Sequence, residues 1–381
     1  MKITIALDSF KGSMSSIEAG NAVKNGVLKA LNNERPTINV IPVADGGEGT
    51  IDALTYGKNF KKRTINVIGP TGKRIDASYI LTDENLAIIE MAEAAGLPLV
   101  PKELRNPLNT TTYGVGELIK DALNNGCKHF IIGIGGSATN DCGIGMLQAL
   151  GYKITDNNGN DVPFGAKGLE VATSILDSQL SSTLHSCDFT IACDVDNPLT
   201  GERGCSKIFA PQKGASPEMV EKMDGWMNAF ASIVEQFCKE NDTEFQFDRM
   251  TPGSGAAGGI GFAFLMMLRG VLMSGAQIVI RETKLEEHIK SSDIVVVGEG
   301  KLDAQSTMGK IPVTIAKLAR KHGKKVIAYA GLVEDKLEIE KNNIFEGVFE
   351  IDRKGMSLEE AMITENSISN LTETVAKTFQ I

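Results

Sequence analysis

The stretch FIIGIGGSATNDCGIGMLQALG, Phe130 to Gly151, determines how the rest of the chain is interpreted. Its first residues are typical of a short buried strand, and its middle consists of glycine and small polar residues. Apolar residues then recur at helical spacing from Gly143 until Gly151. This order predicts a strand, a tight loop and a helix. Unpaired backbone N–H groups gather at the positive end of such a helix, so the loop is a candidate anion site.

The glycines of this loop allow more than one interpretation. Glycine at a strand-to-helix turn often serves only close packing. The loop also fits the dinucleotide fingerprint as Gly133-x-Gly135-x-x-Ala138, with Asp156 about twenty residues further on. It lacks the Gly-Lys-Ser/Thr ending of a P-loop. The glycines alone therefore do not distinguish a kinase from a dehydrogenase.

Length and composition are those of an ordinary globular protein. The 381 residues favour two domains, and 42% of them are hydrophobic and 23% charged. The formal net charge of −9 argues against a nucleic-acid partner, although a local group of lysines could still bind an anionic substrate. We expect small-molecule substrates, and either a monomer or a homodimer.

The sequence predicts no signal peptide, no membrane span and no zinc site. Asp8 interrupts the first apolar run too early for a signal peptide, and no apolar segment is long enough to cross a bilayer. The six cysteines form no CxxC pair, which predicts reduced thiols and a cytoplasmic location. The four histidines lack metal-binding spacing, so we expect no zinc site.

Strands and helices alternate near both ends of the chain. Residues 2–7 predict a strand, Asp8–Ser13 its loop, and a helix follows from Ser15 or Ser16 to Leu31, with Glu18 as capping-box partner. A second capping box, Ser357 with Glu360, begins the final helices. The other predicted elements are strands at 39–43, 189–193, 293–297, 325–330 and 347–351, helices at 114–124, 217–239, 262–272 and 311–322, and a loop at 298–309.

A different pattern occupies the region after residue 63. Short strands at 64–68, 75–81 and 86–91 are separated by the turn sequences GPTG and TDEN, which predicts an antiparallel meander. We therefore predict an α/β fold in which residues 1–62 and 286–381 form a Rossmann-like parallel-sheet domain. Residues 63–285 form an inserted α/β domain with a mixed sheet, and the active-site cleft is expected between the two.

Four loops share one format, in which a strand end is followed by acids, glycines and hydroxyls and then by a helix. They are DSFKGS, ADGGEG, GIGGSATND and GEGKLDAQS. Phosphoryl transfer needs such residues: amides and lysines to hold phosphate oxygens, carboxylates to hold Mg²⁺, and an acid to orient the attacking hydroxyl. Four such loops on strand ends indicate this chemistry far more strongly than one.

The polar residues of these loops also have structural interpretations. Asp8 could cap a helix, and Lys11 could be a solvated surface charge. Asp45 and Glu48 are costly to bury among glycines without a metal or substrate, although Glu48 could stabilise a helix N-terminus. For Asn140 and Asp141 the helix-cap interpretation is strong.

The loop from Cys193 to Ala215 supplies a further acid and base. Asp194 comes directly after a predicted strand, and Lys213 lies downstream in APQKGA. An acid at a strand end followed by basic residues suits a proton acceptor beside a phosphate or carboxylate site. A long exposed connection with ordinary charges explains Arg203 and Lys207 better than it explains Asp194 or Lys213.

Six motifs in this order resemble the bacterial-type (type 1) glycerate kinases over nearly the entire chain. They are DSFKGS, PVADGGEGT, TTYGVGEL, GIGGSATNDCGIGMLQALG, CDVDNPLTGERG with APQKGA, and GEGKLDAQSTMGK. The resemblance implies ATP-dependent phosphorylation of D-glycerate, a Mg²⁺ requirement, and a flavodoxin-like domain with a second, inserted domain. It also favours 2-phosphoglycerate over 3-phosphoglycerate as product. Cys142 and Cys205 stand where the family usually has glycine and alanine.

The residue roles within these motifs are hypotheses. Asp194 is the candidate acid near the glycerate hydroxyl, and Lys11 and Lys213 are candidates to neutralise the transferred phosphoryl group. Asp45 and Glu48 are candidate Mg²⁺ ligands. The candidate substrate- or nucleotide-binding residues are Asp8, Ser9, Gly135, Gly136, Ser137, Asn140, Asp141 and Asp303.

Two other functions compete with a kinase. A nicotinamide-dependent dehydrogenase of a small hydroxy acid rests on the Gly133 fingerprint alone and leaves the other three loops unexplained. A non-catalytic sugar-acid sensor would bind glycerate without consuming ATP.

Overall fold

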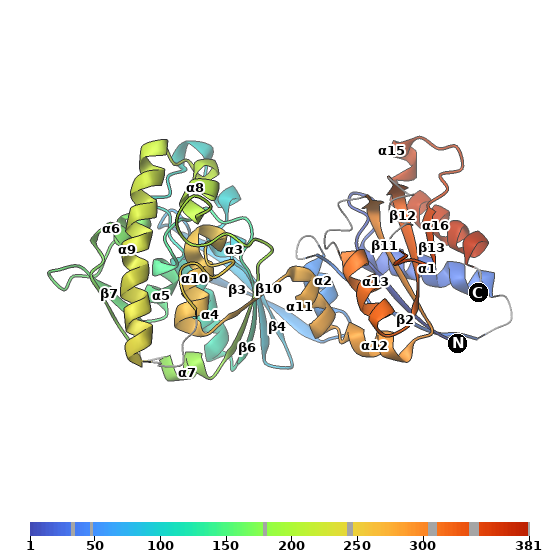
Figure 1. The fold of residues 1–381 in the computed structure, drawn as a ribbon, viewed down its shortest axis with the longest axis horizontal. Helices are drawn as coiled ribbons and strands as arrows, with labels where there is room; N and C mark the ends of the chain where they lie inside the picture. The colour runs from blue at the N-terminus through green and yellow to red at the C-terminus, as the bar shows by residue number, and fades with distance from the viewer. Residues whose placement is uncertain are drawn as a thin grey trace. The chain divides into compact units, whose positions relative to one another are not determined.

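The computed structural model describes residues 1–31, 35–45, 49–177, 181–241, 247–303, 311–334 and 343–379. The chain forms two compact units, coloured by residue number in Figure 1. The first unit comprises Met1–Gly57 and Ser274–Ile381, and the second comprises Lys58–Met273. No helix among the described residues is long and apolar enough to cross a membrane.

The first unit contains a five-stranded parallel sheet in the order β13-β12-β11-β1-β2. Numbered within this unit alone, the order is 2-1-3-4-5, which is the flavodoxin-like order and confirms the predicted fold class. The topological switch point lies between β1 and β11, where ligands bind in such sheets. The strands are β1 (Lys2–Leu7), β2 (Thr37–Val40), β11 (Ile294–Leu302), β12 (Lys325–Val333) and β13 (Gly347–Glu350).

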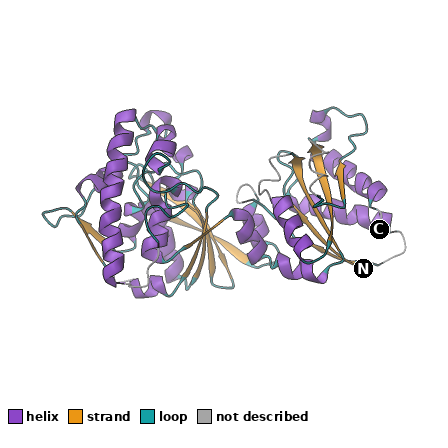
Figure 2. Cartoon of the chain, in the orientation of Figure 1, coloured by secondary structure: helices purple, strands orange, loops and turns teal. Residues whose placement is uncertain are grey.

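Helices cover both faces of this sheet (Figure 2). The face carrying Ile3, Ile5 and Leu7 packs against α1 and α16 in one apolar core. On the other face, the Thr4 hydroxyl bonds Ser292 directly after α12. The helices are α1 (Ser16–Ala30), α2 (Thr50–Thr55), α11 (Gly275–Glu282), α12 (Leu285–Ser291), α13 (Ile311–Lys321), α15 (Leu358–Ala361) and α16 (Thr364–Thr378). Both predicted capping boxes, at Ser15 and at Ser357, are confirmed.

The contact between α1 and α16 requires glycine at position 26. A Cβ there would lie 2.6 Å from the Thr372 carbonyl oxygen and 2.6 Å from Val375 Cβ. We expect Gly26→Ala to lower the free energy of unfolding by about 1–3 kcal/mol, because the two helices must separate. Gly225 in α9 has open space around its Cβ position, so Gly225→Ala should raise this free energy by about 0.5–1 kcal/mol. Urea denaturation of both variants checks the pair, and changes of the same sign would contradict this packing.

The second unit is built on a six-stranded mixed sheet in the order β10-β9-β6-β5-β4-β3. Within this unit, β3, β4 and β5 form the predicted antiparallel meander. The strands β5, β6, β9 and β10 run parallel. The strands are β3 (Phe60–Ile68), β4 (Arg74–Thr82), β5 (Leu86–Glu90), β6 (His129–Gly133), β9 (Asp188–Ala192) and β10 (Val271–Met273), with a separate hairpin of β7 (Lys153–Thr155) and β8 (Ser174–Leu176).

One large apolar core joins this sheet to its helices. The longest helix, α9, buries Val220, Met223, Met227 and Phe230, a spacing of three and four residues that places them on one face. The helices are α3 (Ala92–Ala95), α4 (Tyr113–Asn124), α5 (Ile144–Ala149), α6 (Ala166–Val171), α7 (Ser181–His185), α8 (Cys205–Phe209), α9 (Pro217–Asn241) and α10 (Ala256–Leu268), with 3₁₀ turns at Leu97–Leu99, Lys102–Leu104 and Pro211–Lys213.

Several predicted boundaries differ from the structure, and two of them do so for identifiable reasons. The predicted helix 262–272 ends at Leu268, because Arg269 adopts a left-handed conformation and the next residues pair with β9 as β10. The predicted loop 298–309 begins later, because β11 continues beside β12 to Leu302. Gly298 and Gly300 looked like loop glycines, but a Cβ at Gly298 would lie 2.3 Å from the Tyr329 carbonyl oxygen. Close strand contact explains that glycine.

Candidate active site

The loop after β1 lies at the switch point of the first sheet. The Asp8 amide donates to the Gly298 carbonyl of β11 at 2.9 Å, which fixes the loop to the neighbouring strand. Asp8 is 6% exposed as a residue, and its carboxylate accepts the Ser9 amide at 2.6 Å. Burial, and after it the nearby Asp45, raises the pKa of Asp8 to about 6, against the opposing effects of Ser9 and Lys11. Asp8 thus exchanges its proton near neutral pH.

This raised pKa makes Asp8 a source of instability above pH 6. Between pH 3.8 and about 6 the folded protein binds more protons than the unfolded chain, so the Asp8 contribution to the free energy of unfolding falls as pH rises. We expect that fall to total up to about 3 kcal/mol. The asparagine of Asp8→Asn does not titrate. The free energy of unfolding of this variant, minus that of the unsubstituted protein, should therefore increase by that amount between pH 4 and pH 7. Urea denaturation at both pH values measures it, and a constant difference would contradict the burial of this carboxylate.

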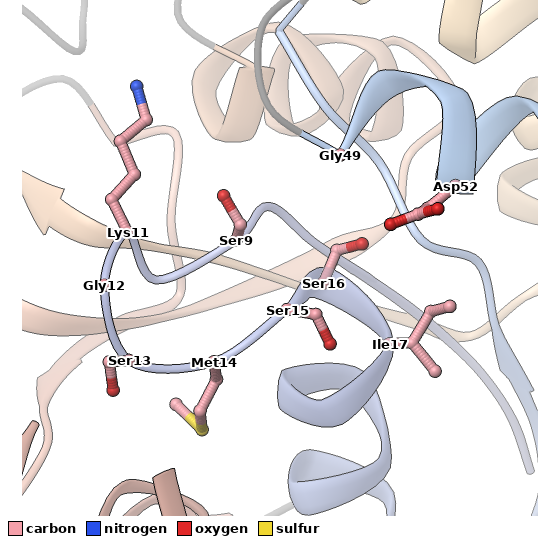
Figure 3. A pocket seen from close by; sticks show the side chains of 10 residues that line it. All are labelled: Ser9, Lys11, Gly12, Ser13, Met14, Ser15, Ser16, Ile17, Gly49 and Asp52. Carbon is pink, nitrogen blue, oxygen red and sulfur yellow. The ribbon is translucent and has the colours of Figure 1, made fainter. Parts of the chain in front are cut away.

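A pocket of about 230 Å³ lies beside the same loop. Its lining includes Lys11, Asp52 and the hydroxyl-bearing residues Ser9, Ser13 and Ser16. Figure 3 shows the Ser9 and Lys11 side chains extending from the loop and the Asp52 carboxylate directed toward Ser16. The Lys11 ammonium and the hydroxyl groups are donors that suit an anionic oxygen ligand, while Asp52 adds one carboxylate to the lining.

Of the residues that line this pocket, only Ser9 and Lys11 were predicted as site residues from the sequence. Asp52 lies in the first turn of α2, directly downstream of the ADGGEGT motif, and Ser16 is the first residue of α1. The signal that could have found Asp52 is its place at a helix N-terminus after a glycine-rich loop. Of the predicted Mg²⁺ ligands, Asp45 is described, whereas Glu48 lies outside the described residues.

Asp303 lies directly after β11, and β11 is the strand next to β1. Its carboxylate is 3.8 Å from the Lys301 ammonium, which also lies 3.0 Å from Glu334. The rest of the GEGKLDAQSTMGK motif after Asp303 lies outside the described residues. The structure therefore places Asp303 on the first unit, together with Asp8 and Lys11.

In the second unit, residues 134–143 connect β6 to α5. Gly135 and Gly136 form an exposed turn, and Gly136 has a φ of +71° that favours glycine. Within the described part of the chain, neither of their backbone N–H groups has an acceptor. Two bonds, from Leu97 N to Gly136 O and from Ala138 N to Ala95 O, hold the turn in place. The turn therefore presents two fixed, open donors.

A buried lysine lies directly behind this turn. Lys213 is 2% exposed, and its Nζ donates to the Ser137 hydroxyl at 2.8 Å and to the Thr139 carbonyl at 2.6 Å. Burial lowers the pKa of Lys213 to about 8, and Cys205 and Asp141 partly oppose this. The structure thus brings together two predicted site residues, Ser137 and Lys213, and adds a positive charge to the glycine turn.

Asp141 caps the ends of two helices from within the protein. Its carboxylate accepts the Thr112 amide and hydroxyl, both at 2.9 Å, and the amides of Gly143 at 3.2 Å and Gly145 at 3.4 Å. Burial raises its pKa in spite of these donors. The donors at the start of α5 are therefore already occupied, whereas those of the glycine turn are open.

Asn140 and Cys142 also face the protein interior. The Asn140 amide donates to the Ser206 hydroxyl at 2.9 Å, while its Oδ1 is buried and has no partner among the described residues. Cys142 has a φ of +52°, the left-handed region that favours glycine, and its thiol is fully buried. This conformation explains why glycine is usual at position 142 in the family that the sequence resembles.

Asp194 lies in the exposed segment just after β9. Two residues later, Asp196 forms an exposed ion pair with Arg203 at 2.6 Å. Lys213, the other candidate from this loop, lies in the 3₁₀ turn after α8. The loop therefore contains one exposed candidate carboxylate, Asp194, and one buried candidate lysine, Lys213.

The geometry around Gly133 does not match a dinucleotide fingerprint. Ten residues separate β6 from α5, so the glycines do not open the helix as that fingerprint requires. Asp156 accepts the amides of Asn158 and Asn160 in a local turn.

Comparison with known proteins gives one consistent result. The sequence model of the glycerate kinase family matches residues 3–381. The glycerate 2-kinase of Escherichia coli (strain K12) is 42% identical over 362 residues, covering 95% of this chain and 93% of that protein. The glycerate kinase of Bacillus subtilis (strain 168) is 41% identical with the same coverages. That of Haemophilus influenzae is 43% identical over 354 residues, with coverages of 92% and 91%.

A solved structure agrees with these relatives. The crystal structure of a candidate glycerate kinase 2 from Salmonella typhimurium LT2 superposes with a TM-score of 0.85 at 39% sequence identity. The match covers 99% of this chain and 96% of that one. The chain therefore belongs to the glycerate kinase family and is a kinase, an enzyme that transfers phosphoryl groups.

Proposed function

We propose that this kinase transfers the γ-phosphoryl group of ATP to D-glycerate and forms 2-phosphoglycerate. Relatives that are 41–43% identical over more than nine-tenths of the chain are named glycerate kinases, and that of E. coli is named glycerate 2-kinase. The observation that carries the proposal is the buried Lys213 ammonium behind the open amides of Gly135 and Gly136. Such fixed positive groups suit an anionic oxygen ligand.

In the second unit, we assign the glycine turn to a phosphate of ATP. The N–H groups of Gly135 and Gly136 donate to its oxygens. The Lys213 ammonium, which is hydrogen bonded to the Ser137 hydroxyl, adds positive charge beside the turn. Asp194, exposed after β9, accepts the proton of the attacking glycerate hydroxyl. The buried Asp141 and Asn140 hold the loop in the shape that binds the phosphate.

In the first unit, Lys11 neutralises charge on the transferred phosphoryl group. Its place in a pocket of hydroxyl groups supports this role. Asp8, Ser9 and Asp303 bind substrate or nucleotide at the ends of β1 and β11, where ligands bind in sheets of this order. Phosphoryl transfer depends mainly on such positioning and charge neutralisation.

The carboxylates of Asp8 and Asp45 fit a Mg²⁺ ion bound together with nucleotide. Burial and the nearby Asp45 raise the pKa of Asp8, and a bound cation would offset both effects. Mg²⁺ is typically bound by one or two carboxylates, phosphate oxygens and water. Bound Mg²⁺ supplies charge neutralisation at the phosphate oxygens.

A cytoplasmic location is also part of the proposal. None of the six cysteines, which all lie in the described part of the chain, forms a disulfide, and five of them are buried. Free thiols suit a reducing compartment. The oligomeric state, monomer or homodimer, stays a prediction.

A coupled assay of ADP release tests the reaction. We expect release from ATP and Mg²⁺ to depend on D-glycerate. Binding of D-glycerate without ADP release would favour the sensor, and reduction of a nicotinamide by the same substrate would favour the dehydrogenase. Either result would overturn the proposed function.

A further inference from the structure

The start of α16 is hydrogen bonded to the Lys11 loop, which precedes it by about 350 residues. The Thr364 hydroxyl donates to the Ser13 carbonyl at 2.9 Å. The Ser13 and Ser367 hydroxyls also bond each other. Because Ser367 gives its single hydrogen to the Ala361 carbonyl, Ser13 is the donor in that pair. The carbonyl and the hydroxyl of Ser13 are therefore both held by residues of α16.

The loop itself is a closed turn. Phe10 and Met14 bond each other through N–H and C=O groups in both directions, at 2.9 Å and 3.1 Å. Gly12, at the tip, has a φ of +75°, and its Cβ position lies 3.3 Å from the end of Met362 just before α16. Lys11 stands on this turn and lines the pocket (Figure 3). A shift of Ser13 would therefore move Lys11.

Packing of α16 on α1 does not require these bonds. That contact is apolar, between Val23 and Val27 of α1 and Leu371 and Val375 of α16. It has its own hydrogen bond, from the Thr372 hydroxyl to the Ala22 carbonyl at 3.1 Å. The hydrogen bonds of Thr364 and Ser367 are instead made to Ser13, in the loop that lines the pocket.

We propose that Thr364 and Ser367 are positioning residues, which hold the Phe10–Met14 turn and thereby place Lys11 for phosphoryl transfer. This inference rests on the proposed function, in which Lys11 neutralises the transferred group. Small displacements of such a group reduce turnover strongly, because the enzyme supplies rate mainly through fixed geometry. The two hydroxyls therefore contribute to kcat without touching substrate.

Thr364→Val and Thr372→Val form a matched pair for the test. Each removes one hydroxyl bond from α16 to a backbone carbonyl, and only the first bond reaches the loop. We expect Thr364→Val to lower kcat roughly 10-fold or more with little change in the KM of D-glycerate. Thr372→Val should keep kcat, and Thr364→Ser, which keeps the donor, should restore it. Equal kcat values in the two valine variants would overturn the proposal.

A double-mutant cycle separates positioning from general weakening of the fold. In a Lys11→Ala background, Thr364→Val should have no further effect on kcat, because the residue that it places is absent. A full additional loss there would overturn the proposal.

Hydrogen exchange of the amides in the Phe10–Met14 turn gives a readout that needs no activity. Thr364→Val should speed their exchange about five-fold, and Thr372→Val should not. Unchanged exchange in Thr364→Val would overturn the positioning role even with full turnover. Absence of glycerate-dependent ADP release in the unsubstituted protein would instead overturn the proposed function, and exchange alone would then decide whether these residues hold the loop.

Discussion

Asp194→Asn is expected to lower kcat by about 10²- to 10⁴-fold, the usual effect of losing a positioned proton acceptor. Asparagine keeps the shape of the side chain but cannot take the proton of the glycerate hydroxyl. Because Asp194 is exposed, we expect the free energy of unfolding to stay within about 0.5 kcal/mol. Steady-state kinetics with urea denaturation of the same sample separates the two effects.

Asp196→Asn is the matched control for this substitution. Asp196 lies two residues away, is exposed, and pairs with Arg203 at 2.6 Å. Loss of this exposed pair should cost less than about 1 kcal/mol of stability and leave kcat unchanged. Near-normal turnover of Asp194→Asn, or an equal loss in both variants, would remove Asp194 from its proposed role.

Lys213→Met is expected to lower kcat/KM for ATP by about 10²- to 10³-fold, as when a preorganised donor is removed from a charged site. Methionine is of similar length but lacks the charge and the bonds to Ser137 and Thr139. In the unsubstituted protein, the ammonium loses its proton as pH rises through about 8, so kcat/KM should fall there. The pH profile of Lys213→Met should lack this alkaline fall.

Lys207→Met controls for loss of a lysine on the neighbouring helix α8. The Lys207 ammonium pairs with Glu202 at 2.8 Å and Glu221 at 3.5 Å. We expect this variant to keep both its kcat/KM and the alkaline fall. If kcat/KM of Lys213→Met still falls as pH rises through about 8, the titrating group is not Lys213, which would contradict this prediction.

The alternation of strands and helices made the fold predictable, whereas several element ends were not. Apolar runs such as residues 294–297 and the helical spacing of α9 depend on burial alone, so one sequence reveals them. The end of α10 and the length of β11 depend on strand partners far along the chain. Gly298 shows the difficulty, because close contact with Tyr329 and a loop conformation both select glycine.

The candidate site was predictable as a set of residues but not as a geometry. The motifs indicated Lys213, yet its burial behind Ser137 depends on a 3₁₀ turn 76 residues away from that serine. The helix-cap interpretation of Asp141 was confirmed by its amide donors, and Asn140 is buried beside Ser206. Asp52 and the hydroxyls of α16 were missed because no local pattern marks them as neighbours of the first loop.

Phosphorus NMR of the product tests the central claim most directly. The protein is incubated with ATP, Mg²⁺ and D-glycerate, and the phosphorus spectrum is compared with authentic 2- and 3-phosphoglycerate. We predict the signal of 2-phosphoglycerate, growing in step with ADP. The signal of 3-phosphoglycerate would contradict the proposed regiochemistry, and the absence of any phosphoglycerate would contradict phosphorylation of glycerate itself.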